Sequence, residues 1–78
     1  MINEFLEQFK LSPARREVAV EMLSSGDTAE VIGNRLFIST ATVKNHCYSI
    51  YKVTNCSGRA ELQARYIQFL ENKLEGMR

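Results

Sequence analysis

The chain has 78 residues, of which 45% are hydrophobic and 24% are charged, with a net charge of +1. A chain of this length forms one domain with a small core, which excludes a self-contained enzyme with its own cofactor pocket. We therefore expect no catalytic activity, no cofactor and no small-molecule ligand. Apolar runs are too short for a membrane span, and residues 1–4 lack the basic region of a signal peptide, so we expect a cytoplasmic protein.

The two cysteines do not form a recognisable metal or disulfide pattern. Cys47 and Cys56 are not spaced as C-x-x-C, and His46 is the single histidine. These residues cannot supply a zinc ligand set, so no metal site is expected. We expect both cysteines to be reduced thiols with small apolar roles.

Charge is distributed unevenly along the chain. Residues 1–30 carry three basic and six acidic side chains, while residues 61–78 carry three of each. Residues 31–60 contain no acid and carry four cations, Arg35, Lys44, Lys52 and Arg59. An acid-free basic window of this kind favours a polyanionic partner, although a solvated surface with four cations is also common.

Helical patterns begin at the N-terminus. Residues 1–10 form an amphipathic segment with an apolar stripe at i, i+3, i+4 and i+7: Ile2, Phe5, Leu6 and Phe9. Ser12 and Pro13 then predict the N-cap and first residue of a second helix that ends near Leu23. We expect Gly26 to terminate it with a positive φ.

The next predicted helix begins at Asp27 or Thr28 and ends near Leu36. Thr28, Ile32 and Leu36 mark the face expected to point inward. Gly33 lies beside this face, where a glycine costs about 1 kcal/mol relative to alanine. We expect it to admit a helix that crosses closely.

A fourth helix is predicted from Thr40 to about Val53. Ser39 is the expected N-cap, and Ile38 with Val43 has the spacing of a hydrophobic staple, which fixes the angle of chain entry. Three side chains are predicted to face inward: Val43, Cys47 and Ile50. The outward face is predicted to carry Ala41, Lys44, Asn45, Tyr48 and Lys52.

The last helix is predicted from about Gly58 to Leu74, with Ser57 as its cap. One side presents Leu62, Tyr66 and Phe69, which suffices to seat the helix on a small domain. The other side presents a second apolar seam of Ile67, Leu70, Leu74 and Met77. The sequence therefore predicts an all-α domain of four helices with an extra short N-terminal helix.

Two helices joined by a short turn make a helix-turn-helix whose second helix is polar and acid-free outside. Such a helix fits the major groove of double-stranded DNA, where Lys44 can donate to guanine and Asn45 can pair with adenine. Tyr48 can reach a base edge, a thymine methyl group or a phosphate. Thr28, Thr40 and Thr42, in first turns, and Lys52 are candidate phosphate contacts. The competing interpretation is a solvated face of a small helical bundle.

A family resemblance rests on residues 36–46, LFISTATVKNH, with Leu11-Ser12-Pro13 and Arg59-Ala60-Glu61-Leu62 at matching spacing. Over residues 11–67 the chain resembles the LuxR-type helix-turn-helix domain, and we assign residues 11–78 to it. The resemblance implies a four-helix DNA-binding domain that pairs through its last helix. It also implies base-reading positions at Ala41, Lys44, Asn45 and Tyr48.

The chain departs from the family pattern at several positions. Arg15 and Val31 replace glutamates, so Asp27 and Glu30 are expected to form a shifted capping box. Ala29-Glu30 stands where the family has a phosphate-binding Asn-Lys pair. Thr54 replaces a core leucine, which predicts a looser helix end or repacking by Val53, and Asn55 is expected to adopt the left-handed conformation.

Two questions remain open at this stage. The first is whether the C-terminal seam forms a homodimer or is covered by the N-terminal stripe of the same chain. The second is whether the domain binds DNA as a transcription regulator, or is a protein-interaction module that sequesters or caps a partner regulator. The chain could be a stand-alone protein or the output domain of a longer one.

Overall fold

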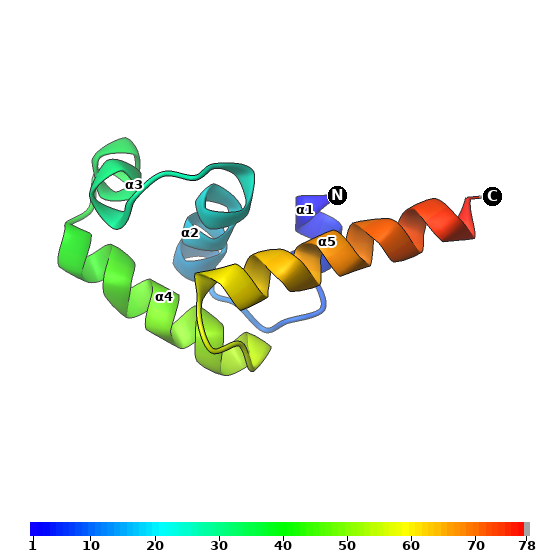
Figure 1. Ribbon diagram of the computed structural model, residues 1–78. Coiled ribbons are helices and arrows are strands. Elements are labelled where there is room, and N and C mark those ends of the chain that lie inside the picture. Colours follow the sequence, from blue (N-terminus) through cyan, green and yellow to red (C-terminus); the bar gives the residue numbers. More distant parts are fainter. Residues whose placement is uncertain (78) are drawn as a thin grey trace.

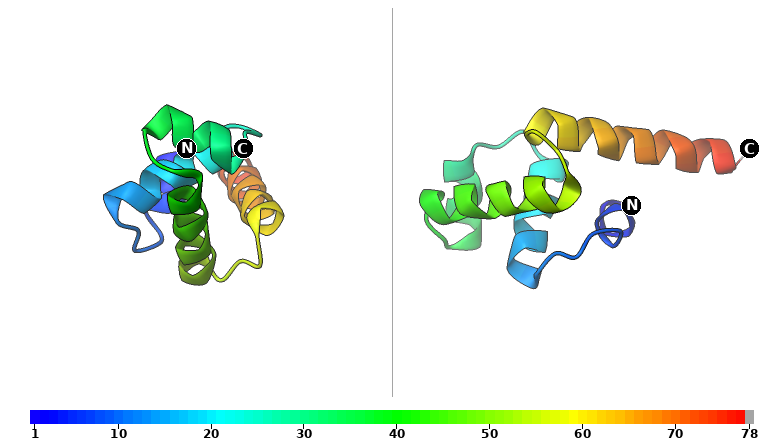
Figure 2. Two further views of the ribbon diagram at one scale, coloured as in Figure 1. Left: turned by 90° about the vertical axis from the view of Figure 1, so that its left-hand side faces the viewer. Right: turned by 90° about the horizontal axis from the view of Figure 1, so that it is seen from below.

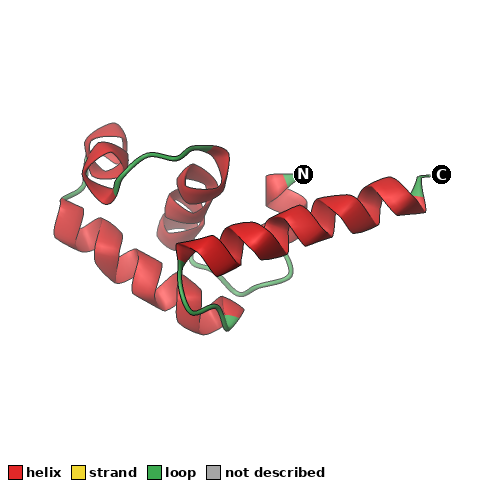
Figure 3. Cartoon of the chain, viewed as in Figure 1, coloured by secondary structure: helices red, strands yellow, loops and turns green. Residues whose placement is uncertain are grey.

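The computed structural model describes residues 1–77 as five helices and connecting loops, with no strand in that range (Figures 1 and 3). The helices are α1 (Ile2–Leu6), α2 (Pro13–Ser24), α3 (Ala29–Leu36), α4 (Thr40–Thr54) and α5 (Arg59–Gly76). The molecule is elongated, 43 × 21 × 21 Å, because the C-terminal half of α5 extends beyond the packed helices (Figure 2). The predicted all-α fold with an extra N-terminal helix is confirmed.

Helix α1 packs on α2 and on one side of α5. Its Phe5 and Leu6 are buried, and the ring of Phe5 lies 5.4 Å from that of Tyr66 and 5.5 Å from that of Phe69. A carboxylate oxygen of Glu4 also lies 2.8 Å from the ammonium group of Lys73. The N-terminal stripe therefore covers the Tyr66–Phe69 side of α5, not the second seam.

Helix α2 begins as predicted but ends differently. Ser12 is the N-cap and accepts a hydrogen bond from the Arg15 amide at 3.3 Å, with proline in the first turn. At the other end no glycine of residues 1–77 has a positive φ, so the expectation for Gly26 was wrong. The hydroxyls of Ser24 and Ser25 instead donate to carbonyls one turn earlier, at 2.7 and 2.8 Å, and satisfy the helix end.

The start of α3 corrects two expectations. Thr28 is the N-cap, accepting from the Val31 amide at 3.3 Å, and is exposed instead of facing inward. The shifted capping box of Asp27 with Glu30 was also wrong. The Asp27 carboxylate lies 2.7 Å from the guanidinium of Arg35, which holds its pKa below the usual value.

The turn between α3 and α4 is built around Gly33. Gly33 is buried, and a Cβ atom there would lie 2.7 Å from the Ile38 carbonyl oxygen and 3.4 Å from a Val43 methyl group. The Ile38 amide donates to the Gly33 carbonyl at 2.9 Å, closing the turn. The close approach is thus to the turn itself and to the first part of α4, which extends the prediction for this glycine.

Phe37 is the residue that reverses the chain in this turn. It adopts the left-handed conformation (φ 60°, ψ 39°), which costs a side chain other than glycine about 1–2 kcal/mol. Its ring is 93% exposed. The sequence predicted neither property, because nothing in the apolar character of this residue signals a left-handed backbone or an exposed ring.

Helix α4 begins and ends with the expected caps. Ser39 accepts from the Thr42 amide at 3.0 Å, and Asn55 adopts the left-handed conformation with φ 57°. Val43 and Ile50 are buried, as predicted. Thr54 is buried too, and its hydroxyl donates to the Ile50 carbonyl at 2.8 Å, so the polar group is satisfied inside the core. Repacking by Val53 was wrong, because that side chain is exposed.

The N-terminus of α5 is capped by Gly58, which has no side chain to accept a hydrogen bond, and not by Ser57. Ser57 lies one position earlier. Its hydroxyl donates to Glu61 at 2.6 Å and its amide donates to the same carboxylate at 3.2 Å. These two bonds lower the pKa of Glu61 and tie the first turn of α5 to the preceding loop. The helix also continues beyond the predicted end at Leu74.

The close contact at Gly33 generates a stability prediction. Gly33→Ala should lower the free energy of unfolding by about 1–3 kcal/mol, because the new Cβ meets backbone that cannot move aside cheaply. Gly26→Ala is the matched control, since nothing lies within 4 Å and φ is not positive there. Urea unfolding of both variants checks this. Equal stability of the two would show that Gly33 does not constrain the turn.

Candidate nucleic-acid interface

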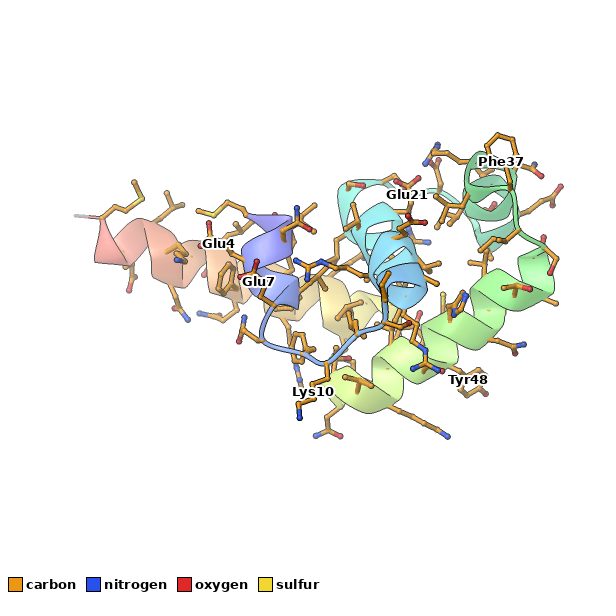
Figure 4. All side chains as sticks on the ribbon, turned by 180° about the vertical axis from the view of Figure 1, so that it is seen from behind. Glu4, Glu7, Lys10, Glu21, Phe37 and Tyr48 are labelled. Carbon is orange, nitrogen blue, oxygen red and sulfur yellow. The ribbon has the colours of Figure 1, made fainter. Side chains whose placement is uncertain are left out.

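One face of α4 is open along its whole length. Its five exposed side chains follow the spacing of a single helical face: Ala41, Lys44, Asn45, Tyr48 and Lys52. Tyr48 is 72% exposed and projects from the side of α4 that is turned away from α2 (Figure 4). The outward face predicted for this helix is thus brought together on one surface.

The three threonines predicted to contact phosphate occupy helix starts. Thr28 caps α3 and is exposed, while Thr40 and Thr42 are half-buried in the first turn of α4. The Thr28 oxygen accepts from the Val31 amide, so its O–H remains able to donate outward. The Thr42 hydroxyl lies 2.8 Å from that of Ser39. Both sites place hydroxyl groups beside helix N-termini, where anions are favoured.

Only two of the four cations in residues 31–60 contribute charge to the open face of α4. Arg35 forms ion pairs with Glu21 and Asp27, which joins α3 to α2 and to the loop before it. Lys44 and Lys52 form no ion pair within residues 1–77 and extend from the open face of α4. The sequence contains four cations in this window, and two of them form contacts that stabilise the fold.

Acidic side chains lie mostly away from α4. Figure 4 shows Glu4 on α1 and Glu7 at its C-terminal cap, both at a distance from Tyr48, and Glu21 on α2. Glu30 is the exception in position, since it is exposed in the first turn of α3. The open face is therefore locally cationic, and Glu30 lies in the helical turn that Thr28 caps.

Arg59 is a positioning residue that sequence reasoning counted only as a charge. From the first turn of α5 its guanidinium donates to the carbonyls of Met22, Ser25 and Asp27. These carbonyls belong to the end of α2 and to the loop that leads into Thr28. Arg59 thus fixes where α3 begins relative to α5. Its place in the quoted family motif was the signal that could have revealed this role.

The second seam of α5 is largely open to solvent. Ile67 is 54% exposed, Leu74 62% and Met77 78%, while Leu70 is half-buried. Helix α1 contacts Tyr66, Phe69 and Lys73, and the exposure of Ile67, Leu74 and Met77 shows that these three side chains are left largely uncovered within residues 1–77. The last two members of the seam, Leu74 and Met77, lie at the C-terminal end of α5, which extends beyond the other helices (Figure 1).

Residues 1–77 contain neither a metal-binding cluster nor a membrane-spanning helix. No group of three or more His, Cys, Asp or Glu side chains is arranged to hold a metal ion there. No helix in that range is long and apolar enough to cross a membrane. Cys47 and Cys56 are both free thiols.

Comparison with known proteins identifies the arrangement. A family model for bacterial regulatory proteins of the luxR family matches residues 10–65. This span contains α2, α3, α4 and the first part of α5, and leaves α1 and the end of α5 outside. Searches of curated proteins and of solved structures returned no match. The chain therefore belongs to the luxR family of bacterial regulatory proteins, which are DNA-binding transcription regulators.

Proposed function

We propose that this domain binds double-stranded DNA sequence-specifically as a homodimer, with α4 in the major groove. The observation that carries the proposal is the open, acid-free face of α4, which is aimed by the Ser39 cap and by the Gly33 turn. The start of α4 and the angle at which the chain enters it are both fixed. The helix can therefore present a constant set of side chains to successive base pairs. This role requires the cytoplasm, where bacterial DNA lies.

Base recognition is assigned to Ala41, Lys44, Asn45 and Tyr48. Lys44 donates to guanine O6 or N7, and Asn45 makes paired hydrogen bonds with adenine. Ala41 leaves room for close approach and offers a methyl contact, while Tyr48 reaches a base edge or a thymine methyl group. All four side chains are exposed on one face, which supports a shared readout.

Backbone contacts are assigned to Thr28, Thr40, Thr42 and Lys52. The threonines lie at the starts of α3 and α4, where hydroxyls and free amides meet phosphate oxygens. Lys52 lies in the last turn of α4 and supplies a cation at the other end of the same face. Such contacts fix the register on the duplex without reading sequence.

Dimerisation is assigned to the seam of Ile67, Leu70, Leu74 and Met77. Full burial of such side chains contributes about 1.5–3 kcal/mol each, and association costs about 4–15 kcal/mol, so pairing in the micromolar range is expected. DNA then completes the pairing by placing the two α4 helices about one duplex turn, roughly 34 Å, apart. The exposure of three of the four residues supports this assignment.

A second candidate function is a protein-interaction module that sequesters or caps a partner regulator without binding DNA. Glu30 favours it, because this acid is exposed beside the threonine-capped edge that would meet phosphate. The small number of unpaired cations on α4 favours it as well. The cationic character of Lys44 and Lys52 favours the DNA proposal.

A salt series on random duplex DNA separates the two functions. Phosphate contacts release counterions, so log K should fall linearly with log salt concentration, with a slope of about −0.9 for each phosphate contacted. Steep salt dependence supports DNA binding. Absence of binding even at about 20 mM salt, well below the range in which screening weakens such contacts, supports the interaction module.

The base-reading assignment predicts the behaviour of two alanine variants. Lys44→Ala and Asn45→Ala should each cost about 1–3 kcal/mol of specific binding, because each removes a direct base contact. Unfolding curves should be unchanged, since both side chains are exposed. Fluorescence anisotropy with a selected operator measures the loss. If both variants bind the operator as the parent does, these residues do not read bases.

The phosphate assignment predicts a loss that is independent of sequence. Thr28→Ala and Thr42→Val should weaken binding to the operator and to random DNA by the same factor. Thr28→Ser is the control, because serine keeps both the hydroxyl and the N-cap of α3. A changed sequence preference without a general loss of affinity would contradict the assignment.

The dimer assignment predicts a folded monomer when charge enters the seam. Leu70→Glu and Leu74→Glu should remain helical, sediment as monomers and bind operator weakly. The Leu74 variant separates interface from core, since that side chain is 62% exposed. Gln68→Glu, on an exposed position of α5, is the matched charge control. If the parent is already a monomer at high concentration and only the Leu70→Glu variant unfolds, then Leu70 belongs to the core and the dimer assignment is wrong.

A further inference from the structure

A cavity of about 290 Å³ opens between the first turn of α3 and the middle of α4. Its floor is the apolar core, represented by Met22, Ile32 and Val43. Two small side chains, Ala29 on α3 and Cys47 on α4, leave the space unfilled between these helices. The cavity therefore exists because the side chains at these two positions are small, and not because the two helices are widely separated.

The size of the cavity suits one substituted ring. An apolar cavity of about 150 Å³ is enough to hold benzene. The present cavity is nearly twice as large and is partly open to solvent, so a ring with a projecting polar group fits without displacing core side chains. Tyr48 and Tyr51 line its α4 side, and flat aromatic side chains favour a flat aromatic guest.

The charges around the cavity are of one sign. Lys44 and Arg59 line it, and no carboxylate does. Neither cation forms an ion pair within residues 1–77. The guanidinium of Arg59 donates only to backbone carbonyls, and its buried Nε–H has no hydrogen-bond partner. An anionic group on the guest would meet the unpaired ammonium group of Lys44 and the guanidinium of Arg59. Besides the hydrogen bond from Arg35, the charge of Arg59 also lowers the pKa of the Asp27 carboxylate.

Neutral donors accompany these cations. Burial raises the pKa of Tyr51, and Arg59 lowers it by a smaller amount, so this phenol keeps its proton at neutral pH. Burial likewise raises the pKa of the Cys47 thiol. A carboxylate guest thus meets the protonated phenol of Tyr51 and no competing negative charge, while the Cys47 thiol donates to the Met22 sulfur at 3.5 Å and is not a thiolate.

We propose that this cavity binds a small aromatic carboxylate, with its ring on the apolar floor and its carboxylate between Lys44 and Arg59. We further propose that the bound molecule excludes DNA, a step that rests on the proposed function. Lys44 and Tyr48 belong both to the rim of the cavity and to the base-reading face. An anion at this rim neutralises Lys44 and repels phosphate, so the two ligands compete.

Titration with benzoate, followed by amide NMR shifts of the whole chain, tests the binding step. Benzoate should bind with Kd on the order of 1 mM, as expected for a guest of nine heavy atoms. Shifts should centre on Ala29, Ile32 and Cys47. Benzyl alcohol, which lacks the charge, should bind more weakly by about tenfold to a hundredfold, because it loses the charge-assisted contacts to both Lys44 and Arg59.

Two variants locate the binding. Ala29→Leu fills the cavity and should abolish benzoate shifts, while Ala14→Leu, the same change on an exposed position of α2, should leave them unchanged. Lys44→Gln, on the exposed rim, should weaken benzoate by about tenfold without affecting benzyl alcohol. Absence of shifts in the parent overturns the proposal. Equal binding to the parent and to a folded Ala29→Leu variant also overturns it.

Competition between benzoate and DNA is measured in a separate experiment, so that the ligand proposal and the DNA-binding proposal can fail independently. Saturating benzoate should reduce the affinity of the parent for operator DNA by about tenfold or more, and should leave that of Ala29→Leu unchanged. If the parent binds benzoate and DNA independently, the exclusion step is wrong and the cavity remains a ligand site. If the chain binds no DNA at all, the proposed function fails while the benzoate shifts still decide the cavity.

Discussion

The missing side chain of Gly33 allows the turn of the helix-turn-helix to close. Because no Cβ is present, the Ile38 carbonyl approaches within the space that a side chain would occupy, and Val43 packs directly beside it. That contact sets how α4 crosses α3. The Ser39 cap, the buried face of α4 and the exposed face opposite all follow from this crossing. The strained Phe37 backbone that links the two helices is tolerated because the same packing holds both ends of the turn.

The charges of the domain are divided between folding and binding. Arg35 and Arg59 join α2, α3 and α5 through carboxylates and carbonyls, and so place the Thr28 end of α3 beside α4. Lys44 and Lys52 are left for a polyanion. With so few open cations on α4, the proposed binding to DNA needs two copies acting together, which the proposed pairing through the apolar seam of α5 would supply.

Local patterns predicted most of the helices, because caps and apolar periodicity are encoded by neighbouring residues. Ser12, Ser39 and Asn55 occupy their expected caps for this reason. The failures depend on distant partners: the Asp27 carboxylate pairs with Arg35 at the far end of α3, and the carbonyls of Met22 and Ser25 at the end of α2 accept hydrogen bonds from Arg59 on α5. The exposed face of α4 was predictable from helical spacing. The cavity beside it was not, since it arises from Ala29 and Cys47 meeting across two helices.

Selection of bound duplexes from a random pool tests the central claim most directly, namely that a pair of α4 faces reads DNA sequence. The account predicts enrichment of two inverted half-sites whose centres lie about 10–10.5 base pairs apart, as expected for a two-fold dimer with one major groove per subunit. Guanine and adenine contacts to Lys44 and Asn45 should appear within each half-site. A pool that shows no enrichment, or enrichment of a single unpaired site, would contradict the account.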